Sequence, residues 1–165
     1  MHPPDAPLPG ATPAAPDNAS SPLASADLAP ENFPLGLAAG LGAALLGGAV
    51  WAAVTVTTNF KIGWIAVGIG FLVGHAVRTA GRGHSQRFAI AGAALALLGC
   101  VLGNYFTVLG TVAGRQHLDF LGLLARIPPG VALKVMVSAF EPMDLLFYGI
   151  AVYEGYKFAR RKRAA

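Results

Sequence analysis

Five polar or ionisable residues lie within or at the ends of long apolar stretches: His75, Arg78, Asn104, Asp144 and Glu154. A charge in hydrocarbon is costly unless it is paired or reaches water, so each residue is a candidate for a structural or a functional role. Glu154 could pair with Arg78, with His75, or with Lys157 three residues further along its own helix. We expect a structural pair that holds the second apolar stretch to the fourth, in preference to a proton relay.

Two of these residues have simple structural explanations. Asp144 lies in the first turn expected for the fourth helix, where a carboxylate interacts favourably with free amides and the helix dipole. Capping is therefore favoured over cation binding at Asp144. Asn104 is predicted to make a hydrogen bond between helices rather than to contact a substrate.

The sequence offers no arrangement typical of a catalytic, cofactor or metal site. His75, His84 and His117 lie on three different segments, without the spacing of a metal-binding helix. The single cysteine, Cys100, excludes an intramolecular disulfide. Because no serine, cysteine or carboxylate has an evident base and orienting partner, we expect no enzymatic activity, no cofactor and no metal.

The composition indicates that the chain is a membrane protein, so its membrane-spanning helices must position these polar groups. The 165 residues are 55% hydrophobic and only 12% charged, and their mean hydropathy is +0.57. A chain of this size has too little polar surface to cover a water-soluble globule. The apolar stretches predict spanning helices at about 35–56, 62–77, 88–112 and 143–158. The expected fold is an all-α, integral membrane four-helix bundle within a domain at 34–159.

Small residues recur at every fourth position along the first three predicted spans, which places them in narrow stripes. Glycine permits close backbone approach, which replaces the hydrophobic effect as the reason for helices to associate in a membrane. The stripes predict helix-packing faces at Gly36, Gly40, Gly48, Gly70, Gly74, Gly99 and Gly103.

The segment between the third and fourth spans is neither plainly aqueous nor plainly spanning. Residues 118–127 can form a short amphipathic helix, which Pro128, Pro129 and Gly130 would end. Residues 131–140 are too short to cross a bilayer. They are expected to form an amphipathic interfacial or re-entrant piece, or an ordinary connecting helix folded over the bundle.

The two ends of the chain differ in charge. Residues 1–33 are rich in Pro, Ala and Ser and contain acidic side chains but no lysine or arginine, which predicts a disordered tail. The missing basic residues also argue against a cleaved secretory signal, so the first span is expected to remain as an anchor. Residues 160–165 form a basic segment expected to bind lipid headgroups through Arg160, Arg161, Lys162 and Arg163.

Basic residues also predict the orientation. Eight lysines and arginines fall on the side that holds both termini: Arg78, Arg82, Arg87, Lys157, Arg160, Arg161, Lys162 and Arg163. Four fall on the other side, so both termini are expected to be cytoplasmic. Nucleic-acid binding is disfavoured as the reason for the basic charge, because the sequence has neither a soluble domain nor aromatic residues among the basic ones.

Two strings resemble segments of a group of uncharacterised bacterial small multi-pass membrane proteins and membrane-anchored domains. They are KIGWIAVGIGFLVGHAVR at 61–78 and PMDLLFYGIAVYEGYK at 142–157. The resemblance implies a location in the bacterial cytoplasmic (inner) membrane. It brings no established activity, cofactor or catalytic residue.

Three functional classes are compatible with these features. The favoured one is a scaffold or accessory subunit that binds a copy of itself or another membrane protein through its glycine faces. The alternative is a subunit of an oligomeric transporter or channel, with Glu154 and His75 near the pathway. A membrane enzyme ranks last, because no catalytic constellation is evident.

Overall fold

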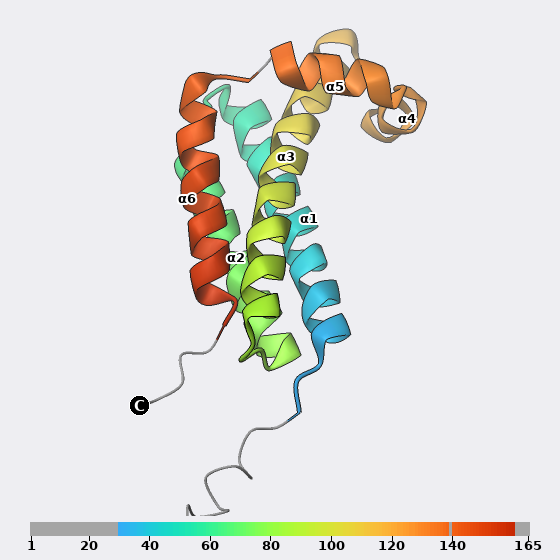
Figure 1. Cartoon of the computed structure of the whole chain (residues 1–165). Helices are drawn as coiled ribbons and strands as arrows, with labels where there is room; N and C mark the ends of the chain where they lie inside the picture. Colours follow the sequence, from blue (N-terminus) through green and yellow to red (C-terminus); the bar gives the residue numbers. More distant parts are fainter. Residues whose placement is uncertain (1–29, 139, 161–165) are drawn as a thin grey trace, which may run out of the picture.

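The computed structural model describes residues 30–138 and 140–160. Most of the predicted tail, and Arg161, Lys162 and Arg163 of the predicted headgroup anchor, lie outside these ranges. All regular structure within them is α-helical (Figure 1). The six helices are α1 (Phe33–Thr58), α2 (Trp64–Gly81), α3 (Gln86–Gln116), α4 (Phe120–Arg126), α5 (Pro129–Ser138) and α6 (Pro142–Phe158).

Four of the helices, α1, α2, α3 and α6, lie side by side and are called the helix group below (Figure 1). Helices α2 and α3 pack against each other, and each also packs against both α1 and α6. Helices α1 and α6 therefore occupy opposite corners. They meet through the rings of Trp51 and Tyr148, whose centroids are 6.3 Å apart in an edge-to-face arrangement.

Three helices, α1, α2 and α3, are long and apolar enough to cross a membrane. At 1.5 Å per residue, their 26, 18 and 31 residues span about 39, 27 and 46 Å. Helix α6 has 17 residues, or about 25 Å, and is not among these three. The structure therefore supports an all-helical fold with three candidate spans, where the sequence predicts four.

Local chemistry explains where the long helices begin and end. The Asn32 side chain accepts a hydrogen bond from the Leu35 amide at 3.1 Å, which caps the start of α1. Helices α1, α2 and α3 each end at a non-glycine residue in the left-handed region: Asn59 (φ 55°), Arg82 (φ 51°) and His117 (φ 53°). This conformation stops a helix and redirects the chain.

Small residues let the helix backbones touch. A Cβ atom added to Gly155 of α6 would lie 2.6 Å from the Gly92 carbonyl oxygen of α3. One added to Gly48 of α1 would lie 3.0 Å from the Gly103 amide nitrogen of α3. The largest fully buried side chains of the described residues include Trp51, Phe88 and Ile69.

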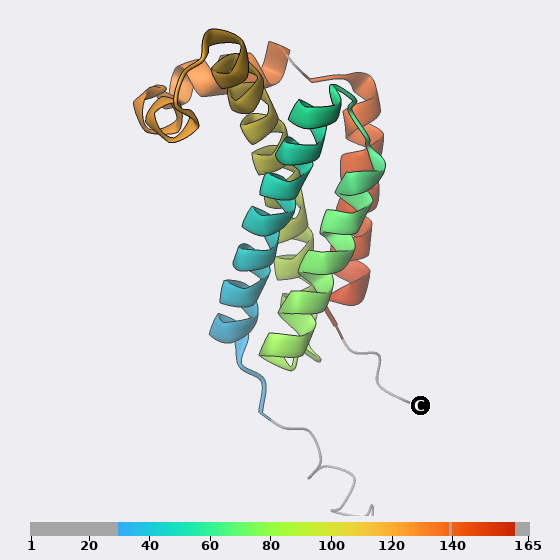
Figure 2. The ribbon, with the colours of Figure 1, turned by 180° about the vertical axis from the view of Figure 1, so that it is seen from behind.

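The helix group has two distinct ends. The basic end contains the start of α1, the α2–α3 turn and the end of α6, and the Asn32 amide donates to the Gly81 carbonyl there at 2.9 Å. The far end contains the α1–α2 turn, the start of α6, and α4 and α5 (Figure 2). Helices α4 and α5 lie across the far end against α3, and neither is inserted between the long helices.

The observed helix bounds differ from the predicted spans at several places. Helix α2 continues to Gly81 instead of ending at Val77, because the left-handed stop comes only at Arg82. Helix α1 begins at Phe33, within the segment predicted as tail. At the predicted proline break, α4 ends at Arg126 and α5 starts at Pro129.

Candidate functional site

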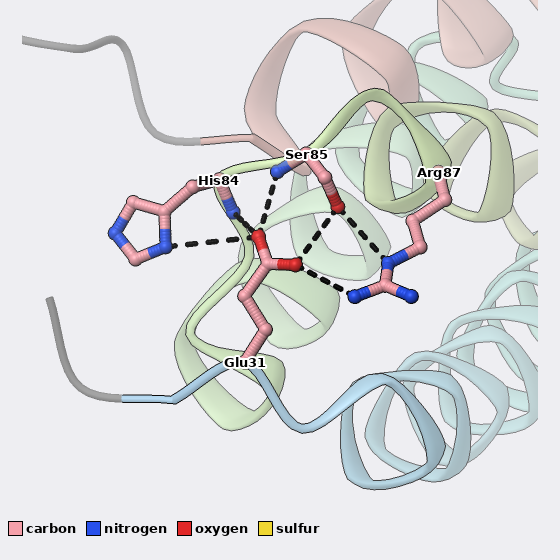
Figure 3. A network of polar contacts seen from close by, with 4 residues as sticks. All are labelled: Glu31, His84, Ser85 and Arg87. Atoms are coloured by element: carbon pink, nitrogen blue, oxygen red, sulfur yellow. Dashed lines mark hydrogen bonds and ion pairs between the residues drawn. The ribbon is translucent and has the colours of Figure 1, made fainter.

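A network of polar contacts at the basic end joins the residue before the α1 cap to the start of α3 (Figure 3). It consists of Glu31, His84, Ser85 and Arg87 and is called the Glu31 clasp. The amides of His84 and Ser85 donate to Glu31 Oε1 at 2.6 and 2.8 Å. The Ser85 hydroxyl and the Arg87 guanidinium donate to Oε2 at 3.0 and 2.8 Å.

The clasp places an internal anion at the start of α3, where free amides and the helix dipole favour negative charge. The Arg87 hydrogen bond is the largest cause of a lowered pKa at Glu31, about 2 instead of 4.5. Burial opposes this shift, and the donors on His84 and Ser85 reinforce it. Glu31 is therefore a carboxylate at neutral pH, and it stabilises the α2–α3 turn.

A second charged group lies at the far end, where the α1–α2 turn meets α6. Lys61 Nζ lies 3.2 Å from Asp144 Oδ2 and 3.7 Å from Glu141 Oε1. Asp144 Oδ2 also accepts from the Glu141 amide at 3.0 Å, and Asp144 is 7% exposed. Asp144 thus caps α6 and also links α6 to the residues that precede α2.

The buried polar groups between α3 and α6 interact with each other or with the backbone. The Tyr148 hydroxyl donates to the Cys100 carbonyl at 3.2 Å, and the Asn104 side chain interacts with that of Tyr148. The Thr107 hydroxyl donates to the Gly103 carbonyl of its own helix at 2.8 Å. Asn104 also lines a cavity of about 210 Å³, whose other lining residues are the apolar or aromatic side chains of Val101, Leu133, Met136, Val137, Phe140 and Tyr148.

The residues predicted to pair near the basic end are placed on separate helices with local partners. Glu154 lies 3.9 Å from Lys157 on α6. The His75 ring stacks on the Phe71 ring, and His75 Nδ1 lies 3.2 Å from Arg78 Nη2. All three residues belong to α2. The ionic link between the α2 side and α6 is found instead at the far end, between Lys61 and Asp144.

The glycines predicted as packing positions all lie in contacts within the chain. Gly36, Gly40, Gly48, Gly70, Gly74, Gly99 and Gly103 are buried. Gly36 approaches Gly81, and Gly70 approaches the backbone of Ala151. Gly155, which the sequence analysis did not single out, makes one of the closest backbone contacts.

Two further predictions concern the lipid headgroup anchor and the absence of a metal site. Of the predicted headgroup anchor, only Arg160 is described, and its guanidinium lies 5.6 Å from the Tyr156 ring centroid. Within residues 30–138 and 140–160, no three His, Cys, Asp or Glu side chains come together as a metal site would require.

The Glu31 clasp was missed by sequence reasoning, because Glu31 was assigned to the tail on composition. The available clue was local: Asn32 and Pro34 form a capping pattern immediately before an apolar run, which indicates an ordered helix start. That pattern does not identify His84, Ser85 or Arg87 as partners, since they are more than fifty residues away.

Comparisons with known protein families, with characterised proteins and with solved structures find no match for this chain.

Proposed function

We propose that this chain is a four-span protein of the bacterial inner membrane, akin to small multi-pass membrane proteins, and that it serves as a scaffold or accessory subunit. Its fold would be a four-helix bundle with both termini in the cytoplasm. The lipid bilayer and another membrane protein, or a second copy of the chain, would be its partners.

The contacts of α6 support its role as the fourth span. It packs against α2 and α3, and its outward side chains Leu145, Leu146 and Tyr153 are apolar or aromatic and exposed. Asp144 and Glu154, which oppose membrane insertion, lie close to Lys61 and Lys157 respectively. A helix of about 25 Å can span a bilayer core that thins slightly around it.

Close packing inside the helix group is the observation that carries the scaffold assignment. The backbones of α3 and α6 touch at Gly92 and Gly155, and those of α1 and α3 touch at Gly48 and Gly103. Such contacts leave no room for a column of water between these helices. A pathway through one chain would have to lie elsewhere, and an oligomeric transporter would need a pore between copies.

The glycine faces are used within the chain, so a partner would meet other surfaces. Helices α4 and α5 contact only α3 among the described helices, and their side chains Leu121, Leu133 and Val137 are exposed. The outer faces of α1 and α6 also expose large apolar side chains, as expected for contact with lipid.

Single-cysteine labelling distinguishes a scaffold from a transport subunit. In a Cys100→Ala background, Asn104→Cys and Glu154→Cys would be treated with a membrane-impermeant thiol reagent from each side of sealed vesicles. We expect neither position to react from both sides, because the interior is closed by packing. Reaction of either position from both sides would contradict the scaffold assignment and favour a conducting pathway.

A companion protein gives the second test. Isolation from native membranes in mild detergent should yield a stoichiometric partner, or a defined homo-oligomer, for the unmodified chain. Substitution Val137→Ser on α5 would test the α4–α5 surface, with Leu46→Ser on the exposed face of α1 as control. A monomer without companions would contradict the assignment.

A further inference from the structure

A polar cavity of about 340 Å³ lies beside the Glu31 clasp at the basic end. It is lined by Arg78, Thr79, Arg82, Gly83 and His84. Three further cavities, between α1, α3, α4, α5 and α6, are lined mainly by apolar side chains. The cavity at the α2–α3 turn thus differs from them in containing two arginines and no acidic residue.

The charge of the two arginines is not balanced within the described part of the chain. Glu31 pairs with Arg87 and lies 3.8 Å from His84, while Glu154 lies beside Lys157. The Arg78 guanidinium contacts the His75 ring at 3.2 Å. Neither Arg78 nor Arg82 forms an ion pair with a described residue. Two unpaired guanidiniums near one cavity repel each other unless an anion lies between them.

The backbone holds these two arginines at one site. The Arg82 amide donates to the Arg78 carbonyl at the end of α2, and Arg82 has a φ of 51°. The Gly83 amide donates to the same carbonyl at 3.2 Å. Both guanidiniums therefore extend from a single hydrogen-bonded turn. The His84 ring adds a further group, since its Nε2 is buried, faces away from Glu31 (Figure 3) and has no hydrogen-bond partner in the described ranges.

We propose that this cavity binds the phosphate group of an anionic ligand through Arg78 and Arg82. Guanidinium groups match phosphate oxygens in shape and charge, and they form paired hydrogen bonds that a hydrated ammonium does not. The carboxylate of the Glu31 clasp already occupies the start of α3, so the ligand uses the arginine side of the turn.

The phosphate can come from a phospholipid headgroup or from a soluble molecule. A headgroup is at the right depth if α2 spans the bilayer, because the cavity lies at the end of that helix. The lipid source therefore rests on the four-span placement proposed above. A soluble phosphate does not depend on it.

The test compares the unmodified chain with Arg78→Gln/Arg82→Gly. Glycine suits the positive φ at residue 82, so the second substitution removes the guanidinium without straining the turn. The matched control is Arg115→Gln/Arg126→Gln, which removes two exposed arginines near the far end. Circular dichroism and size-exclusion chromatography would verify that all three proteins are folded.

Two binding measurements identify the source. The first is native mass spectrometry from nanodiscs of phosphatidylcholine and phosphatidylglycerol, which reports the ratio of the two lipids retained. The second is the Tm in lipid-free detergent with millimolar inorganic phosphate, compared with chloride at equal ionic strength. Loss of both arginines should weaken binding about tenfold or more.

Enrichment of phosphatidylglycerol in the unmodified chain and the control, lost in Arg78→Gln/Arg82→Gly, supports the site with a lipid as its source. Stabilisation by inorganic phosphate with the same pattern supports the site with a soluble source, even if the chain proves not to span the membrane. Absence of both effects, or equal loss in the two double variants, would overturn the proposal.

Discussion

Glu31 illustrates how a single carboxylate can determine the structure of a turn more than fifty residues away. Its two oxygens accept from two amides, a hydroxyl and a guanidinium, so both are used by the chain itself. The contacts lie at the basic end of the helix group, and the Arg87 side chain is 59% exposed, so protons have access. The stability of the clasp should therefore depend on pH.

Glu31→Gln should lower the Tm of the detergent-solubilised chain at about pH 7, because it removes the ion pair with Arg87. The folded pKa of Glu31, about 2, is below the ordinary 4.5, so its stabilising contribution is complete above 4.5 and is lost as the pH falls toward 2. The Tm difference between the two proteins should shrink across that window. The measurement is thermal unfolding as a function of pH.

Glu154→Gln is the matched control for this experiment. Its partner Lys157 is 47% exposed and 3.9 Å away, and such pairs contribute little to stability. We expect a small Tm change at every pH. A Glu31→Gln difference that stays constant from neutral to acidic pH would show that the carboxylate charge is not what stabilises the turn.

Asp144 provides a second prediction, at the far end. Asp144→Ala removes the acceptor for the Glu141 amide and the partner of Lys61, and loss of such a cap costs about 1–2 kcal/mol. Asp144→Asn keeps an acceptor and should lose less. Chemical unfolding in detergent measures both free energies; an equal loss for the two variants would mean that only the charge matters.

The predictability of these sites depends on sequence distance. The capping role of Asp144 was predictable, because a cap involves residues of the same turn. The Lys61 and Arg87 partnerships are set by how helices far apart in sequence are arranged, which no local pattern encodes.

At the level of helices, a glycine in close contact can be compared with a glycine on the same helix that faces open space. On α6, a Cβ at Gly155 would collide with the Gly92 carbonyl oxygen and Ala96, whereas one at Gly149 would meet nothing within 4 Å. Gly155→Ala should destabilise the chain by about 1–3 kcal/mol through overpacking. Gly149→Ala should be neutral or stabilise by up to about 1 kcal/mol, since alanine favours the helix.

The measurement is the free energy of unfolding of both variants in the same detergent. The pair Gly70 and Gly68 on α2 repeats the comparison, because Gly70 meets the Ala151 backbone and Gly68 faces open space. If Gly155→Ala and Gly149→Ala have equal effects, α6 does not pack on α3 through this glycine.

Helix existence was predictable from apolar length, but helix ends were not. The chain stops α1, α2 and α3 at Asn59, Arg82 and His117, none of which is the glycine usually expected at a left-handed stop. Glycine instead lies inside the helices, where it serves packing. Composition therefore predicts which segments are helical, but not the residue at which each helix stops.

At the level of the whole molecule, the described start and end of the chain lie at the same end of the helix group. This arrangement agrees with an even number of crossings. The same end of the helix group also contains Arg78, Arg82, Arg87 and Arg160. Lysine and arginine are enriched on the cytoplasmic side of membrane proteins, so this clustering is expected if that end is cytoplasmic.

The most direct test of the four-span account is the accessibility of three single cysteines in a Cys100→Ala chain: Gln86→Cys at the start of α3 beside the α2–α3 turn, Gln116→Cys at the end of α3, and a cysteine added after Ala165. Both glutamines are exposed, and neither belongs to the Glu31 clasp. In sealed vesicles of known orientation, an impermeant reagent should label the turn and the added cysteine from the cytoplasmic side, and Gln116→Cys only from the opposite side. Labelling of all three from one side would contradict the account.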